Sequence, residues 1–78
     1  MGKKMLHSVP TTARDKATGD WSVHGWKMAI PAGQGTVERS QDCGDTWQPV
    51  FVIEHPRNQV VDYEARLGPK PLYRWVDA

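Results

Sequence analysis

Turn residues divide this chain into short segments, and that division limits its fold more than any other feature of the sequence. Pro, Gly and Asn gather at residues 31–35, 55–59 and 68–71, where they favour tight turns. Between the turns, apolar and polar side chains alternate over a few residues, which is the period of a β-strand. We therefore expect five strands, at residues 21–30, 36–39, 47–54, 60–67 and 72–76. A short helix also fits the fourth of these segments, residues 60–67.

Five short strands joined by tight turns predict a mostly β, single-domain fold. The expected architecture is a small antiparallel barrel or sandwich of the SH3-like or OB-like kind, formed by residues 20–78. Residues 1–19 are polar and small, so we expect a flexible N-terminal arm whose ordered part is at most a short strand at residues 5–9. The apolar run at residues 50–53 predicts the centre of the sheet, or a strand that a partner covers.

The alternation also predicts which side chains face the core. In the first strand, Trp26, Met28 and Ile30 share one face. In the fourth segment the odd-numbered residues are expected to point inward and the even-numbered residues to point to water. The inward set is Val61, Tyr63, Ala65 and Leu67, and the outward set is Val60, Asp62, Glu64 and Arg66.

Charge and cysteine content narrow the classes of function. The 78 residues carry 10 Lys and Arg against 9 Asp and Glu, a net charge of +1, which is too small for a dedicated duplex-DNA binder. One cysteine, Cys43, cannot form an internal disulfide, so a reducing compartment and cytoplasmic localisation are expected. No export signal and no apolar run of about 20 residues is present, so we expect no membrane partner.

Residues 40–47 read SQDCGDTW and carry the one recognisable motif. They fit the pattern S-x-D-x-G-x-T-W and resemble the Asp-box, or BNR repeat, of sialidases and other β-propeller proteins. The resemblance implies a structural hairpin loop between the second and third expected strands, and it implies no enzymatic activity. A propeller needs several four-stranded blades, which 78 residues cannot supply. The matching residues are Ser40, Asp42, Gly44, Thr46 and Trp47.

Each key residue of this motif has a physical role in such a turn. Asp42 can accept hydrogen bonds from backbone N–H groups, Gly44 can take a positive φ, and Trp47 can pack over the loop. Cys43 is flanked by carboxylates that disfavour its thiolate, so we expect an inert thiol. The three histidines and Cys43 match no zinc spacing, and no acid–base pair stands at a recognisable spacing. We expect no catalytic residues, no metal and no cofactor.

Aromatic residues suggest a binding surface. Four Trp, two Tyr and one Phe are more large rings than a small core easily buries, so some should be exposed. Exposed rings beside cations anchor protein interfaces and stack on single-stranded bases. The alternative is that Trp26, Trp47 and Trp75 belong to the core. The predicted aromatic and basic patch consists of Arg66, Lys70, Tyr73, Arg74 and Trp75.

Three functions fit these features. The first is a non-catalytic protein-interaction module that binds a protein partner or itself, as small accessory proteins of phages and mobile elements do. The second is a single-stranded nucleic-acid binder that uses the aromatic and basic patch. The third is a small enzyme or carbohydrate binder with a site shared between subunits. The small net charge argues against the second function, and the lack of an acid–base pair argues against the third, so an enzyme is the less favoured class.

Overall fold

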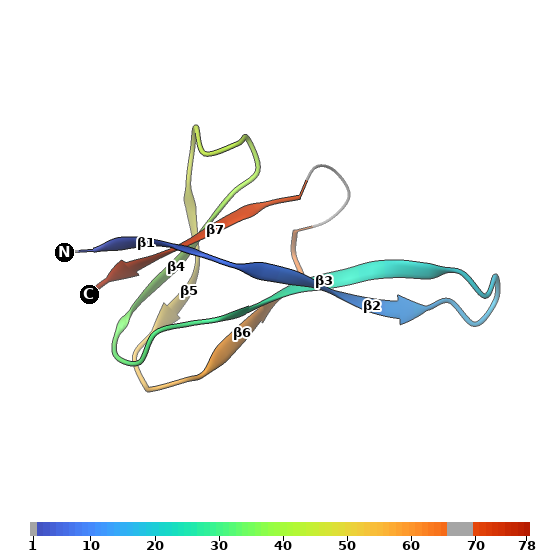
Figure 1. The fold of residues 1–78 in the computed structure, drawn as a ribbon, viewed down its shortest axis with the longest axis horizontal. Coiled ribbons are helices and arrows are strands. Elements are labelled where there is room, and N and C mark those ends of the chain that lie inside the picture. Colours follow the sequence, from blue (N-terminus) through green and yellow to red (C-terminus); the bar gives the residue numbers. More distant parts are fainter. Residues whose placement is uncertain (1, 66–69) are drawn as a thin grey trace.

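The chain is a small all-β domain built from two antiparallel sheets (Figure 1). The structure is a computed structural model, and it describes residues 2–65 and 70–78. Within these residues there are strands and turns but no helix. The strands are β1 (Lys3–Leu6), β2 (Ser8–Arg14), β3 (Trp21–Ala29), β4 (Gly35–Ser40), β5 (Gln48–Ile53), β6 (Gln59–Asp62) and β7 (Leu72–Asp77).

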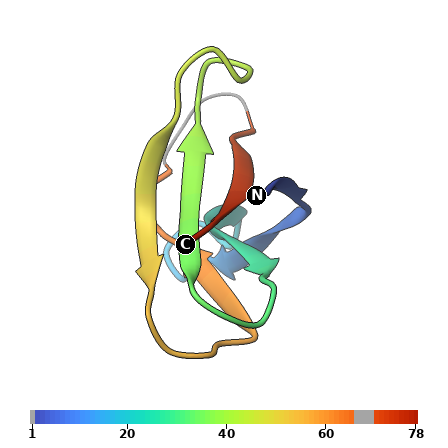
Figure 2. The same ribbon diagram turned by 90° about the vertical axis from the view of Figure 1, so that its left-hand side faces the viewer.

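The two sheets differ in size and share one continuous stretch of chain. The larger sheet has the order β1-β7-β4-β5, and the smaller has the order β2-β3-β6. A single residue, His7, separates β1 from β2, so the N-terminal segment leaves the edge of one sheet and enters the edge of the other. The sheets do not close into a barrel, and the view in Figure 2 shows the strands of the smaller sheet crossing behind those of the larger one. The predicted small antiparallel β domain is therefore confirmed, in its open form.

The hydrophobic core lies between the two sheets. Tyr73 and Trp75 on β7 are its largest side chains, and both are almost completely buried. Gly35 on β4 lets the Trp75 ring approach the backbone, because a Cβ at this position would lie 2.3 Å from the ring. The other buried members of the cluster are Met28, Ile30, Val37, Ile53 and Val60.

A two-stranded hairpin arm projects from this body. β6 pairs with residues 26–29 of β3 only, so the first half of β3 has β2 as its sole strand partner in the described chain. A bulge interrupts the pairing between Thr11 and Thr12. Figure 1 shows the β2–β3 hairpin extending beyond the rest of the molecule. We call residues 12–23 the hairpin arm.

The order of the strands corrects three sequence expectations. Residues 3–14 form β1 and β2, which is more order than the short strand at residues 5–9 expected in a flexible arm, and the described residues contain seven strands and not five. β5 is an edge strand and not the centre of its sheet, and Val52 on it is 71% exposed. The central position belongs to β7 and β4, because β7 can bury two large rings on its inner face.

The facing of residues 60–67 is also different from the prediction. Of the described residues 60–65, only 60–62 belong to a strand, β6, which excludes a helix over the first part of this segment. Val60 and Asp62 point inward and are buried, whereas Tyr63 is 57% exposed, so the predicted alternation was wrong by one residue at these positions. Ala65 is buried as predicted, and Arg66 and Leu67 lie outside the described residues. The predicted face of Met28 and Ile30 is confirmed, with Trp26 packed partly against the core.

In the part of the chain that the structure describes, no helix has the length and apolar character needed to cross a bilayer.

Candidate functional site

The predicted aromatic and basic patch does not form an exposed surface. Tyr73 is 0% exposed and Trp75 is 2% exposed, so neither ring can stack on a base or a partner. The reason is the central position of β7, whose residues 73 and 75 point into the core while residues 72, 74 and 76 point away from it. The prediction was wrong for these two rings, and the alternative that Trp75 is a core residue is confirmed.

The two described cations of the patch lie over different tryptophans. The Lys70 Nζ is 5.6 Å from the centre of the Trp26 ring, and the Arg74 guanidinium is 4.2 Å from the centre of the Trp47 ring. Arg74 also donates from Nε to the Glu38 carboxylate at 2.6 Å. Both distances lie within the range of a cation–π interaction, so each cation is paired with a ring of the domain itself. The remaining predicted member, Arg66, lies outside the described residues.

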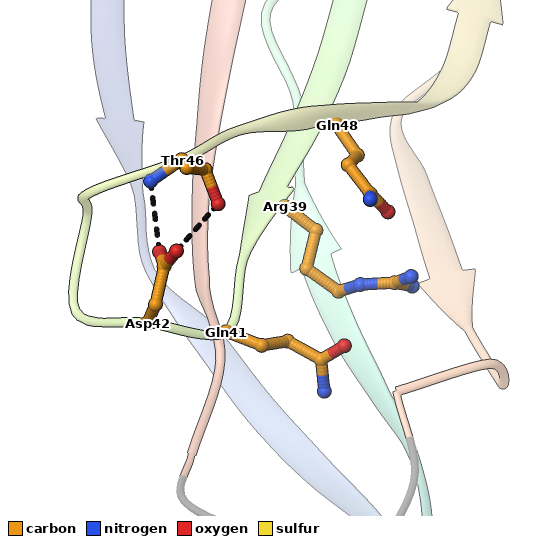
Figure 3. Close-up of a pocket in the computed structure, with 5 residues that line it drawn as sticks. All are labelled: Arg39, Gln41, Asp42, Thr46 and Gln48. Atoms are coloured by element: carbon orange, nitrogen blue, oxygen red, sulfur yellow. Dashed lines mark hydrogen bonds between the residues drawn. The ribbon is translucent and has the colours of Figure 1, made fainter.

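Residues 40–47, which we call the Ser40–Trp47 loop, join β4 to β5 as a hairpin, as the sequence predicted. Asp42 is the centre of its hydrogen bonds (Figure 3). Its carboxylate accepts from the Thr46 backbone N–H at 2.8 Å, from the Thr46 hydroxyl and from the Ser40 hydroxyl at 2.7 Å. The Ser40 hydroxyl in turn accepts from the Gly44 N–H at 2.8 Å.

Backbone conformation and the indole ring complete this loop. Gly44 has φ 96°, and Cys43 before it has φ 61°, a left-handed conformation that is uncommon for a residue with a side chain. The Trp47 Nε1–H donates to the Gly44 carbonyl at 3.0 Å. The exposed Cys43 thiol is held at the tip of this turn. The polar groups of the loop are thus used to hold its shape.

The hydrogen bonds to Asp42 lower its pKa to about 2, from an ordinary value of 3.8. The Thr46 hydroxyl makes the largest contribution, followed by the Thr46 N–H and the Ser40 hydroxyl. A carboxylate with so low a pKa is fully ionised near neutral pH and is a poor general base. Asp42 therefore has the properties of a structural group.

A small polar hollow adjoins the loop (Figure 3). Its volume is about 170 Å³, which suits a few water molecules better than a cofactor. Two of its charged side chains are already paired, Asp42 with Thr46 and Arg39 with Asp62. The hollow therefore offers no free acid–base pair. It is lined by Arg39, Gln41, Asp42, Thr46 and Gln48.

Sequence reasoning missed a buried charged residue, Asp62, which is 2% exposed. Its Oδ2 accepts from the Arg39 Nη1 at 2.7 Å and from the Tyr73 hydroxyl at 2.6 Å, and its Oδ1 accepts from the Glu64 N–H at 3.0 Å. Arg39 and Tyr73 are cross-strand partners on β4 and β7, whereas Asp62 ends β6 in the other sheet. This group, which we call the Asp62 cluster, therefore ties the two sheets together. An alternating pattern alone places an aspartate outward, so no local signal identified it.

Burial and hydrogen bonding act in opposite directions on Asp62. Desolvation raises its pKa, but the hydrogen bonds from Tyr73 and Arg39 outweigh that effect, and the net pKa lies below the ordinary value. Desolvation and the bond to the Asp62 carboxylate both raise the pKa of Tyr73. An ionised aspartate beside a neutral tyrosine is a stable arrangement over the whole physiological range. We therefore assign the cluster a structural role.

The Asp62 cluster predicts a large difference between two otherwise similar substitutions. Asp62→Asn leaves the Arg39 guanidinium, whose side chain is 10% exposed, without its countercharge, and should lower the free energy of unfolding by about 3 kcal/mol. Glu38→Gln breaks the ion pair between Glu38 and Arg74, and both of these side chains are about one-fifth exposed. This substitution should lower the free energy of unfolding by less than about 1 kcal/mol. Urea unfolding followed by tryptophan fluorescence measures both. Equal costs for the two variants would contradict the structural role of the cluster.

The low pKa of Asp42 predicts acid sensitivity in the Ser40–Trp47 loop. Because the folded pKa of about 2 is below the ordinary 3.8, the ionised carboxylate stabilises the fold above about pH 4, and this contribution is lost as the pH falls to about 2. Asp42→Asn should melt several degrees below the parent at neutral pH, and the difference should shrink in acid.

Asp45→Asn is the matched control for that experiment, because Asp45 lies in the same loop and no side-chain hydrogen bond to it is found in the described chain. Circular dichroism melts across this pH range compare the three proteins. A deficit of Asp42→Asn that stays constant down to about pH 2, or an equal deficit for Asp45→Asn, would refute the assignment.

The described residues contain no group of three or more His, Cys, Asp or Glu side chains that could hold a metal ion. The polar groups of the Ser40–Trp47 loop are instead hydrogen-bonded within that loop. Those of the Asp62 cluster are hydrogen-bonded within that cluster. Comparison with known proteins finds no matching family model, no matching curated protein and no matching solved structure.

Proposed function

We propose that this protein is a non-catalytic protein-interaction module that associates with a second copy of itself through strand β5. One observation carries the proposal: β5 is an edge strand with an uncharged apolar stretch, residues 50–53, and Val52 on it is 71% exposed. The outer backbone row of such a strand is free to pair with another strand. The Ser40–Trp47 loop serves as a rigid turn that holds the start of β5 in place.

The other three sheet edges carry features that discourage pairing. β1 begins with Lys3 and Lys4, and β2 contains Pro10 beside a bulge. β6 has four residues. Charges, prolines, bulges and short length are the devices with which proteins protect their edge strands. On β5, Pro49 protects only the beginning of the strand, which leaves residues 50–53 as the least protected edge.

The residues of β5 are chemically suited to pairing with a second copy of the same strand about a two-fold axis. Antiparallel pairing of β5 with its copy would join the two four-stranded sheets at their edges. Because residues 50–53 carry no charge, no like charges meet when the two copies of this stretch pair. The inward-facing Phe51 and Ile53 would continue the core of each copy across the new pair, and Val52 would lose part of its contact with water.

The nucleic-acid alternative has less support. It relied on exposed rings beside free cations in the predicted patch, but in that patch Tyr73 and Trp75 are buried and Arg74 is bonded to Glu38. The net charge of +1 adds no long-range attraction for phosphates.

The proposal predicts that Val52→Lys reduces self-association without unfolding the protein. The substitution would bring two ammonium groups into the new strand pair, and Val52 is so exposed that it leaves the core intact. Light scattering coupled to size exclusion should show a dimer for the parent and a monomer for the variant at equal concentration.

Val23→Lys is the matched control, because Val23 is also an exposed strand valine, 54% exposed, but lies on the hairpin arm. It should keep the parental mass. A parent that is monomeric at every concentration, or a dimer that only Val23→Lys disrupts, would overturn the assignment of β5.

A further inference from the structure

The face of the smaller sheet that points away from the core carries little charge. On β3, Met28 packs into the core, so its neighbours Lys27 and Ala29 lie on the opposite face. Paired residues of neighbouring strands share a face, which extends this surface onto β2 and β6. We call it the outer face of the smaller sheet. Together with Tyr63, which follows β6, its residues are Val9, Thr11, Gly25, Lys27, Ala29, Gln59 and Val61.

Most of this outer face is apolar or small. Val9 is 39% exposed and Tyr63 is 57% exposed, and Ala29 is exposed as well. The Tyr63 ring lies over Gly25, because a Cβ on Gly25 would come within 2.8 Å of the ring. The solvent-facing side of an antiparallel sheet is normally polar, and contiguous apolar surface there marks an interaction site.

Lys27 is the one charged residue of this outer face, and it has no carboxylate partner in the described chain. Its cross-strand neighbours are Val9 on β2 and Val61 on β6, and neither of the ion pairs found among the described residues includes it. On the larger sheet, by contrast, the outward-facing Arg74 of β7 lies opposite Glu38 of β4 and is bonded to it. The smaller sheet therefore presents one positive charge between two valines, without a countercharge.

The charge and the width of the outer face define the partner that fits it. A second copy packed face to face would add another Lys27 and no carboxylate, so the partner is a different chain with an acidic residue opposite Lys27. The face is three strands wide, which is about 10 Å between β2 and β6 and matches the diameter of one α-helix, about 10 Å. The described chain has no helix of its own to cover this face.

We propose that the outer face of the smaller sheet binds an amphipathic α-helix of a partner protein, with one carboxylate within its apolar stripe. The apolar side chains of the helix would lie on Val9, Ala29 and Val61. The carboxylate would meet the ammonium group of Lys27, whose stem can lie along apolar surface. The inference goes beyond the proposed self-association and does not depend on it, because β5 belongs to the larger sheet.

The test uses two fluorescein-labelled helical peptides of about 18 residues, or about five turns. They share one stripe of leucines and differ only at one position in the middle of that stripe, which is Glu in one peptide and Lys in the other. Fluorescence anisotropy at low salt should show that the parent binds the Glu peptide at least about fivefold more tightly than the Lys peptide. Lys27→Glu should reverse this preference, and because Lys27 is exposed, the substitution should leave the fold intact.

Lys16→Glu is the matched control. It changes the net charge by the same amount, but Lys16 lies in the turn between β2 and β3, so this variant should keep the parental preference within about twofold. The same reversal in both variants would assign the preference to net charge and overturn the site. Equal affinity of the parent for the two peptides, or no binding of the Glu peptide at about 100 μM protein, would overturn it as well.

Repeating the titration with Val52→Lys separates this inference from the proposed self-association. Binding of the Glu peptide that persists in that variant supports a helix site away from β5. Binding that disappears together with the dimer would place the peptide at the β5 edge and contradict the site on the smaller sheet.

Discussion

The buried carboxylate of Asp62 is the interaction on which the arrangement of the two sheets depends. It is the point at which β6 of the smaller sheet meets β4 and β7 of the larger one, through Arg39 and Tyr73. Most of the free energy that holds the sheets together comes from the apolar core, but apolar contacts tolerate sliding and repacking. A charged pair with a short hydrogen bond does not, because any shift that separates Asp62 from Arg39 leaves two charges desolvated. The cluster thus fixes the position of one sheet on the other.

The Ser40–Trp47 loop fixes the geometry within the larger sheet, where it joins β4 to β5. Its hydrogen bonds lie within a single hairpin, so it sets the register of β4 against β5 without reference to the core. Trp47 then connects the loop to β7, because Arg74 lies over its ring and is bonded to Glu38 on β4. The domain thus has two rigid points, one between the sheets and one at a hairpin.

How far the sequence predicts this structure depends on where each signal lies. The turns and the strands from β3 onward follow from local patterns, and the contacts of Asp42 and Gly44 follow from turn chemistry. Of β1 and β2, only a short strand at residues 5–9 was expected, because KKML and SVPTTAR lack an apolar alternation, and their strand conformation comes from pairing with β7 and β3. The order of the strands is equally non-local, so the apolar β5 was placed at the centre when it lies at an edge. Asp62 was assigned to the surface because its partners come from distant strands.

The central claim is that β5 pairs with its copy, and hydrogen exchange of its backbone amides tests this most directly. Mass spectrometry of the segment that contains residues 48–53 should show exchange that slows as the protein concentration rises, because pairing protects the outer amides of the edge strand. The hairpin arm and the central strand β7 should exchange at rates that do not depend on concentration. A β5 exchange rate that stays constant from dilute to concentrated protein would contradict the account.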